Sequence, residues 1–287
     1  MQELICYRQL PLWTHDSIPQ AFQRKHNTKA GTWAKLTILK GELNFAMLSE
    51  SGEIQSEYVF STTHQPPFIE PQAWHKIVST SQDIECQLSF YCKPEDYFSK
   101  KYQITPTHSE ILAAMPHLHG GKALDVGCGS GRNSLFLSQQ GFEVDAWDIN
   151  ENSIQKLNDI IQSEQISNIH PAIRDLNLNP DIDDQYDFIC CTVVMMFVES
   201  STIPPLIQQM QNATKPQGFN LIVCAMDTED YPAQPDFPFA FKPGELSVYY
   251  QDWTTIKYNE DVGELHRVDE NGNRIKQRFA TLLAQKT

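Results

Sequence analysis

The stretch Ala123–Leu137, ALDVGCGSGRNSLFL, decides the fold of this chain. It begins as a short apolar strand that ends in Asp125, continues through a turn with glycines at alternate positions, and ends in a helical pattern. Because glycine has no Cβ atom, the backbone of such a turn can approach a bound ligand closely. The order of strand, glycine-rich turn and helix therefore predicts a cofactor-binding loop, with a purely structural strand-to-helix turn as the alternative.

The chain beyond this loop alternates between strand patterns and helix patterns. Buried strands are predicted at residues 122–126, 142–148, 169–175, 186–194 and 219–227, and helices at residues 133–140, 151–163 and 202–214. Strands that alternate with helices form parallel sheets, and the helices cover both faces of the sheet. The pattern predicts an α/β fold with a doubly wound, mostly parallel sheet.

The residues before Lys93 follow a different pattern. Short alternating runs at residues 36–48, 57–60 and 85–92 are separated by Gly, Pro and Ser-Gly turns, which is typical of a small antiparallel β domain. Residues 93–110 are charged, contain two prolines and lack a period, so we interpret them as a linker into the next domain. We predict an all-β domain over residues 1–94 and the α/β domain over residues 95–287.

The composition narrows the class of protein. With 40% hydrophobic and 20% charged residues the chain is globular, and its longest apolar run, residues 193–198, is far too short to span a bilayer. The formal net charge of −14 argues against nucleic acid, because phosphate contacts need a basic surface. Seven cysteines without a C-x-x-C pair are typical of reduced thiols. We expect a cytoplasmic protein with no membrane and no nucleic-acid partner.

Three further positions bear on the cofactor. Arg132 stands where a dinucleotide-binding fingerprint has its third glycine, which weighs against NAD. Asp148 ends the second predicted strand, where a carboxylate can accept hydrogen bonds from ribose hydroxyls. The G-x-G-x-G spacing resembles the S-adenosylmethionine loop of class I methyltransferases, in which an acid such as Asp175 faces the adenine. The alternative is that Asp175 and Asn177 only cap the next turn.

The resemblance becomes specific when longer segments are taken together. They are ALDVGCGSGRNSLFL, VDAWDIN, YDFICCTVVMMF, FNLIVCAMDTEDYP, FPFAFKPGEL and YNEDVGELHRVDENGNRIKQRFATLLA. From about Tyr97 onward the chain resembles the tellurite-resistance methyltransferases of the TehB type, and HNTKAGTWAKLTILKGELNF with EPQAWHKI resembles the cupin-like β domain of their long form. The resemblance implies a seven-stranded class I sheet, S-adenosylmethionine as methyl donor, S-adenosylhomocysteine as product, and tellurite or selenite as acceptor.

The same resemblance implies a set of donor-site residues. They are Asp125, Gly127, Gly129 and Gly131 of the loop, Arg132 and Asn133 behind it, Asp148 with Ile149, Asp175 with Leu176, and Thr192 with Val193. Tyr102 and His108 resemble the family's N-terminal lid; alternatively, Tyr102 is a packed linker aromatic and His108 begins a helix. We do not expect Cys128, Cys190 or Cys191 to act as nucleophiles, because methyl transfer from a sulfonium needs none.

The acceptor side is predicted from the C-terminal part of the chain. Residues 226–253, rich in Pro and aromatics and too irregular for a helix, are interpreted as a lid. Asn271-Gly272 predicts a two-residue hairpin turn that pairs Asp269 with Arg274 and Arg267 with Lys276; a bulged three-residue turn would change these partners. We expect His266, Arg267 and Arg274 to hold an acceptor oxyanion, with a solvated hairpin as the alternative.

The N-terminal domain offers fewer signals. His26, Glu42, His64 and His75 do not complete the metal pattern of a cupin, so no metal site is predicted. Substrate sensing, a dimer contact and domain stabilisation are its alternative roles, and a homodimer is left open. Two other functions also remain: a small-molecule or thiol methyltransferase of other specificity, and a non-enzymatic S-adenosylmethionine sensor.

Overall fold

The chain forms two compact units. The computed structural model describes residues 3–287, apart from the side chain of His266. The first unit ends at Ile104 and the second begins at Thr105. That residues 95–287 fold by themselves stays a prediction.

The first unit consists mainly of antiparallel strands, as the short alternating runs predicted. In one sheet, β7 (Glu85–Cys92) pairs with β1 (Ile5–Gln9), β2 (Trp13–Thr14) and β3 (Trp33–Lys40). In the other, β4 (Glu42–Leu48) lies between β5 (Ile54–Ser61) and β6 (His75–Thr80). The helical segments of this unit are α1 (Gln20–Gln23), η1 (Pro94–Asp96) and α2 (Tyr97–Tyr102).

The alternation of side chains along β3 explains how this unit builds its core. Ala34, Leu36 and Ile38 are buried, while the intervening Lys35 and Thr37 point the other way and are half-buried. Successive residues of a strand face opposite sides of a sheet, so every second position can be apolar and enclosed. The β domain therefore has its own hydrophobic interior.

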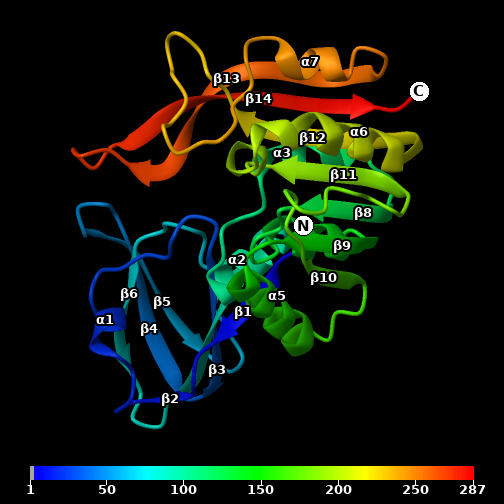
Figure 1. Cartoon of the computed structure of the whole chain (residues 1–287). Helices are drawn as coiled ribbons and strands as arrows, with labels where there is room; N and C mark the ends of the chain where they lie inside the picture. Colours follow the sequence, from blue (N-terminus) through cyan, green and yellow to red (C-terminus); the bar gives the residue numbers. More distant parts are fainter. Residues whose placement is uncertain (1–2) are drawn as a thin grey trace. The chain divides into compact units, whose positions relative to one another are not determined.

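The second unit is a seven-stranded sheet covered by helices. The strands are β8 (Gly121–Val126), β9 (Phe142–Asp148), β10 (Ile169–Ile173), β11 (Tyr186–Thr192), β12 (Thr214–Ala225), β13 (Thr254–Val268) and β14 (Arg274–Gln285). Figure 1 shows them in the order β10-β9-β8-β11-β12-β14-β13, in which β14 runs antiparallel to both of its neighbours and the other pairs are parallel. The predicted class I methyltransferase sheet is confirmed.

The three longest helices of this unit, α4 (Arg132–Gln139), α5 (Glu151–Glu164) and α6 (Ile203–Ala213), lie close to the positions that the sequence predicts. The unit also contains α3 (Ser109–Ala114) and α7 (Glu245–Tyr249), with the shorter turns η2 (Met115–His117), η3 (Met195–Phe197) and η4 (Ser200–Thr202). In α5, Ile154, Leu157 and Ile160 form one buried face, and the Asn150 side chain caps the helix by accepting from the Ser153 amide at 3.1 Å.

Helix α7 lies within residues 226–253, for which the sequence predicts no helix, so that prediction is wrong for one short segment. Gly244, with φ of 75°, turns the chain just before it. A Glu245 carboxylate oxygen accepts from the Lys242 amide at 2.8 Å and Ser247 Oγ donates to the Gly244 carbonyl at 2.7 Å. Local side-chain hydrogen bonds thus stabilise one short turn that hydrophobic periodicity cannot reveal.

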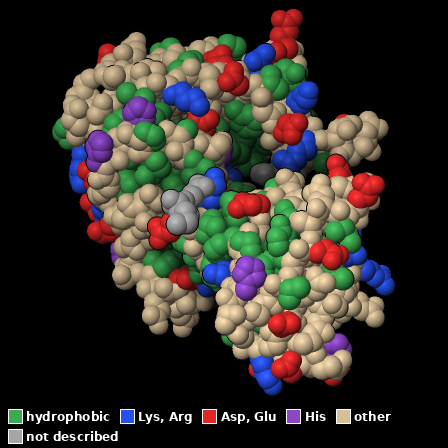
Figure 2. Space-filling view, turned by 180° about the vertical axis from the view of Figure 1, so that it is seen from behind, with side chains coloured by type: hydrophobic (Ala, Val, Ile, Leu, Met, Phe, Trp, Pro, Cys, Tyr) green, Lys and Arg blue, Asp and Glu red, His purple; other side chains and the backbone are tan. Residues whose placement is uncertain are grey.

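The surface carries both charges intermixed. On the face seen in Figure 2, Lys and Arg side chains are scattered among Asp and Glu side chains. Within residues 3–287, no helix combines the length and the apolar character that a membrane crossing requires.

Candidate functional site

The glycine-rich loop lies at the carboxyl end of β8, and its three glycines have three different surroundings. Gly127, Gly129 and Gly131 all have positive φ, at 73°, 56° and 85°. A Cβ atom on Gly127 would lie 2.3 Å from Val194 Cγ2, and one on Gly131 would lie 2.4 Å from Leu157 Cδ1. A Cβ atom on Gly129 would meet nothing within 4 Å. Packing therefore requires two of the glycines, whereas Gly129 leaves space beside the loop for a ligand.

Asp148 is held beside this loop at the end of β9. One oxygen of its carboxylate accepts from the Gly129 amide at 2.7 Å, and the other accepts from the Asn150 amide at 2.8 Å. Each carboxylate oxygen has a further lone pair, so the group can also accept from the two hydroxyls of a ribose. Ile149, the next residue, is 61% exposed and offers an apolar surface beside that carboxylate.

Asp125 differs from Asp148 because its carboxylate is fully buried. Ser134 Oγ donates to it at 2.6 Å and Cys190 Sγ at 3.5 Å. Burial raises the pKa of this carboxyl, while the Ser134 hydrogen bond opposes the rise. The group therefore ties the start of α4 to the end of β8. Sequence reasoning missed Ser134, whose only signal is its place in the first helical turn after the loop.

Asn133 joins three segments around the loop. Its Nδ2 donates to Thr192 Oγ1 at 3.0 Å, and its Oδ1 accepts from the His108 amide at 3.1 Å. His108 in turn caps α3, because its Nδ1 accepts from the Glu110 amide at 3.2 Å. His108 is thus a helix-start residue anchored to the loop. Its role as a lid stays a prediction, as does that of Tyr102, which belongs to the first unit.

Val193 follows β11 in a strained conformation. Its φ is 64°, in a region that β-branched residues rarely adopt, and its amide donates to the Val223 carbonyl at 2.7 Å. Such a residue costs of the order of 1–3 kcal/mol and is typical of ligand-binding sites. The proposed contacts of Thr192 and Val193 with the methyl donor stay predictions.

Asp175 caps the turn after β10. Its Oδ1 accepts from the Asn177 amide at 2.9 Å, which is the capping arrangement that the sequence left open. Leu176 is buried in the core of the second unit. The proposed contacts of both residues with adenine stay predictions.

A cavity of about 440 Å³ lies beside the loop. It is lined by residues at the start of α3 and of α4, after β11, and on β12, β13 and β14: His108, Ser109, Glu110, Arg132, Val193, Val223, Asn259, Asp261, Val262, Gly263, Glu264, Leu265, Phe279 and Thr281. Burial lowers the pKa of Arg132, while nearby Asp125 opposes this shift. Three carboxylates, Glu110, Asp261 and Glu264, share the lining with this arginine. Glu110 lies on α3, far in the sequence from Asp261 and Glu264 on β13, and no sequence pattern indicates this group of carboxylates.

The hairpin between β13 and β14 differs from the predicted register. Val268 pairs with Arg274, so the predicted pairs of Asp269 with Arg274 and of Arg267 with Lys276 are wrong. The Asp269 amide donates to the Asn273 carbonyl at 2.8 Å. The side chain of Asp269 also accepts from the amides of Asn271 and Asn273, at 2.9 and 2.8 Å. This capping, with Gly272 at φ of 80°, stabilises the bulged three-residue turn instead.

The proposed acceptor cations lie near the tip of this hairpin. Arg267 Nη1 is 2.7 Å from an Asp236 carboxylate oxygen, and its guanidinium lies 5.2 Å from the centre of the Phe237 ring. Arg274 is exposed. Neither arginine lines the 440 Å³ cavity, and the side chain of His266 lies outside the described residues.

The aromatics between β12 and β13 mostly pack onto the sheet. Phe241 and Tyr250 are 0% and 1% exposed, and Tyr250 Oη accepts from Asn220 Nδ2 at 2.9 Å. Phe237 and Phe239 pack more loosely against the same core. For the two buried rings, packing explains their presence without a ligand contact.

The cysteines near the loop are not activated. Burial raises the pKa of Cys128, Cys190 and Cys191, and the negative charge of Asp125 adds to the rise. Protonated thiols are poor nucleophiles. Among the described residues, no group of three or more His, Cys, Asp and Glu side chains comes together in a form that could hold a metal ion.

Known protein families match both parts of the chain. The family model described as tellurite resistance protein TehB matches residues 90–283, and that of the TehB-like domain matches residues 8–88. The chain is 52% identical over 284 residues to a Haemophilus influenzae protein named probable S-adenosyl-L-methionine-dependent methyltransferase TehB, covering 99% of each. It is 40% identical over 239 residues to hemagglutinin 1 of Eikenella corrodens, covering 83% of this chain and 79% of that protein. The crystal structure of TehB from Haemophilus influenzae is similar with a TM-score of 0.95 at 51% identity, covering 99% of each chain.

Proposed function

The chain belongs to the TehB family of S-adenosylmethionine-dependent methyltransferases, and from that premise we propose that its methyl acceptor is a metalloid oxyanion, tellurite or selenite. The observation that carries the proposal is the match of the tellurite-resistance family model to residues 90–283, which contain the glycine loop and the sheet apart from the last two residues of β14. The activity would detoxify the oxyanion. We also propose a cytoplasmic location, because all seven cysteines are free thiols.

The residues around the loop fit S-adenosylmethionine. The open space at Gly129 gives the donor room to lie against the backbone, and the Asp148 carboxylate can accept from its ribose. When bound, the donor supplies a methyl group on a positively charged sulfur. A lone pair on tellurium or selenium would attack the methyl carbon, and the electrons of the carbon–sulfur bond would return to sulfur. The chain has only to position the acceptor and exclude water, so no enzyme nucleophile is needed.

For the acceptor we propose His266, Arg267 and Arg274 as contacts. Arginine suits an oxyanion because its planar fork of donors stays charged at any working pH. Arg267 already pairs with Asp236 at 2.7 Å, so an oxyanion has to compete with that carboxylate for the guanidinium, whereas no such ion pair is found for Arg274 among the described residues.

A second acceptor class is favoured by the charge of the 440 Å³ cavity. Asp261 and Glu264 line it and form no ion pair among the described residues, while Glu110 pairs with Lys257 at 2.6 Å. Carboxylates repel a dianion, so a neutral small molecule or a thiol is the competing acceptor.

Turnover with a panel of acceptors tests the function. Purified protein is incubated with S-adenosylmethionine and tellurite, selenite, iodide or a small thiol, and S-adenosylhomocysteine is measured. We expect the largest kcat/KM for tellurite or selenite, and little product from an Asp148→Ala control. A preference for thiol would assign the competing acceptor class. Tight donor binding without product from any acceptor would favour a sensor.

A further inference from the structure

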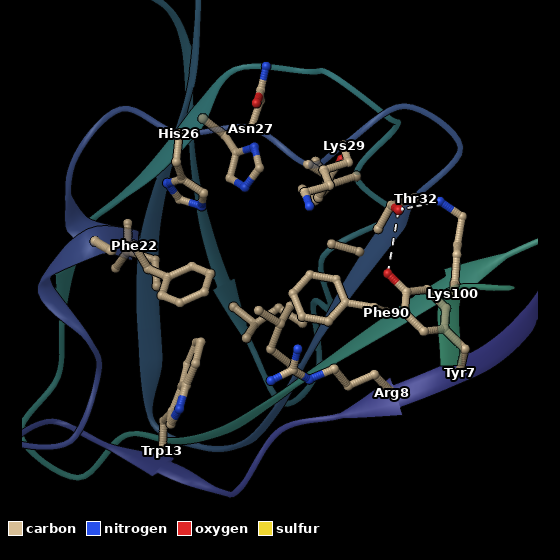
Figure 3. A pocket seen from close by; sticks show the side chains of 18 of the residues that line it. Tyr7, Arg8, Trp13, Phe22, His26, Asn27, Lys29, Thr32, Phe90 and Lys100 are labelled. Atoms are coloured by element: carbon tan, nitrogen blue, oxygen red, sulfur yellow. Dashed lines mark hydrogen bonds between the residues drawn. The ribbon is translucent and has the colours of Figure 1, made fainter. Parts of the chain in front are cut away.

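The first unit contains a large cavity that the methyl-transfer reaction does not use. Its volume is about 670 Å³, within the range of small-molecule binding sites. Residues from β1, β2, α1, β3, β4, β6, β7, α2 and the segment between α1 and β3 line it. Among them are five Phe, Tyr and Trp rings, two histidines and three cations. Figure 3 shows these side chains converging on the cavity.

The charged residues of this cavity are all cationic. Arg8, Lys29 and Lys100 line it, and no Asp or Glu does so among the described residues, although the whole protein has a net charge of −14. Figure 3 shows the Arg8 side chain reaching into the cavity between Trp13 and Phe90. The described residues provide no ion pair for Arg8 or Lys29. This local excess of positive charge favours an anionic ligand.

Lys100 is less available than the other two cations. Its ammonium donates to Thr32 Oγ1 at 3.1 Å and to the Ala30 carbonyl at 3.2 Å. It also opposes the rise in pKa that burial causes at Asp96. The charge that a ligand can use therefore comes mainly from Arg8 and Lys29.

The walls of the cavity are aromatic and aliphatic. Trp13 and Phe22 lie with their ring centres 4.8 Å apart, and Phe45, Phe90 and Leu36 add further apolar surface. Flat rings such as these pack well against an aromatic ligand, by offset or edge-to-face contact. An inorganic anion alone would leave most of this surface without a partner.

Two histidines add hydrogen-bond acceptors. His26 and His75 form an antiparallel backbone bridge, with ring centres 4.2 Å apart. Each Nδ1 lies within hydrogen-bond distance of a backbone carbonyl, at 2.9 Å from that of Arg24 and 2.8 Å from that of Ala73. A carbonyl only accepts, so each Nδ1 carries the proton and, in the neutral ring, each Nε2 is an acceptor.

Both rings are neutral at physiological pH. Burial lowers the pKa of His26, and it lowers that of His75 to about 4. A ligand that occupies the cavity beside these rings gains by offering an O–H or N–H donor to an Nε2 atom.

We propose that this cavity binds a small organic acid with an aromatic body, its carboxylate held by Arg8 and Lys29 and a hydroxyl or N–H group facing His26 and His75. The site would make the β domain a ligand-sensing module attached to the methyltransferase. A cationic ligand is excluded by Arg8 and Lys29, and a purely inorganic anion by the aromatic walls.

Calorimetric titration of the full-length protein tests the proposal, with S-adenosylhomocysteine present in saturating amount so that the donor site is filled. The probes are 4-hydroxyphenylacetate, its uncharged amide, phenylacetate without the hydroxyl, and the cation tyramine. We expect 4-hydroxyphenylacetate to bind tightest, the amide about tenfold or more weaker, phenylacetate weaker by a smaller factor, and tyramine weakest. Absence of binding by both acids, or equal binding of acid and amide, would overturn the proposal.

Matched variants locate the binding. Arg8→Gln should weaken 4-hydroxyphenylacetate about tenfold and Arg8→Lys by only a few-fold, because lysine keeps the charge without the planar fork. Lys40→Gln removes one exposed charge from the same domain outside the cavity and should bind as wild type. Arg8 is exposed, so these substitutions leave the fold intact, which circular dichroism checks. Equal affinity of wild type and Arg8→Gln would refute the site.

Discussion

Gly129 and Gly127 differ in what an added Cβ atom would meet. At Gly129 it would point into open space, whereas at Gly127 it would collide with Val194. Gly129→Ala places a methyl group into the space beside the loop and a non-glycine residue at positive φ, which costs about 1–2 kcal/mol. We expect S-adenosylmethionine affinity to fall at least tenfold while the protein stays folded. Gly127→Ala must displace the β-branched Val194 and should lower the melting temperature far more. Calorimetry and thermal denaturation of both variants check this contrast, and equal stability losses would contradict it.

Asp148 is the residue whose loss should weaken the donor most directly. A carboxylate that accepts from two hydroxyls contributes about 1.5–3 kcal/mol, so Asp148→Ala should weaken S-adenosylmethionine roughly 10–100-fold. The substitution also removes the acceptor of the Gly129 amide, so part of the loss comes from a looser loop. Asp183→Ala, which removes an exposed acid elsewhere in the unit, is the matched control. Calorimetric titration measures both; unchanged binding by the Asp148 variant would remove this residue from the donor site.

At the scale of elements, the β13–β14 hairpin carries the proposed acceptor contacts. Arg267→Ala and Arg274→Ala should each lower kcat/KM for tellurite roughly 10–100-fold and leave S-adenosylmethionine affinity nearly unchanged, because a charged contact with the acceptor contributes about 1.5–3 kcal/mol. Lys276→Ala removes an exposed hairpin charge outside the proposed cluster and should keep full turnover. Methyl-transfer kinetics measure kcat/KM for tellurite in each variant, and titration with S-adenosylmethionine measures its donor affinity. Wild-type turnover in both arginine variants would leave the hairpin as a solvated element only.

Strand β6 should lose stability in acid because it carries His75. The pKa of His75 is lowered to about 4 in the folded protein against 6.5 in the unfolded chain. Between these pH values the unfolded chain binds the proton and the folded chain does not. The free energy of unfolding is therefore not reduced by His75 above pH 6.5, and it falls as the pH drops toward 4. From pH 7 to pH 5 we expect a loss of about 2 kcal/mol from this residue.

Hydrogen exchange of the β6 and β4 amides, corrected for intrinsic rates, measures that loss in the whole protein. His75→Asn should be less stable at pH 7 but should show a smaller drop between pH 7 and pH 5. His64→Asn, which replaces an exposed histidine of the same domain, should keep the wild-type dependence. An unchanged pH dependence in the His75 variant would contradict the assignment.

At the scale of the molecule, we expect the methyltransferase part to be self-sufficient. Residues 95–287 include the seven-stranded sheet, its hydrophobic core and the glycine loop. A fragment of these residues should fold and bind S-adenosylmethionine within a few-fold of the full chain, because a domain with its own core folds alone. Circular dichroism and calorimetry of the fragment test this. An insoluble fragment, or one that does not bind the donor, would show that the two units fold as one.

Local patterns predicted most of the sheet but not its side-chain partners. The strands β8 and β11 are mostly apolar runs, and β9 places acidic residues between apolar ones, so the type and position of these strands can be predicted from neighbouring residues. The partner of Asp125 is different: Ser134 becomes its donor only once α4 packs on β8. The prediction of a two-residue turn after Val268 is also wrong. The Asp269 side chain accepts from the Asn271 and Asn273 amides and so stabilises a longer turn than the one that Asn271-Gly272 favours.

The sequence by itself determined the fold class, the glycine loop, the family and the place of Asp148 at the end of the second strand of the α/β sheet, because each depends on spacing along the chain. Only the tertiary structure decided which glycine faces open space, how the hairpin registers, and that Arg8, His26 and His75 line one cavity. Those three residues lie in separate segments, on β1, before β3 and on β6. Pairing of strands distant in sequence brings them together, and no local period encodes that pairing.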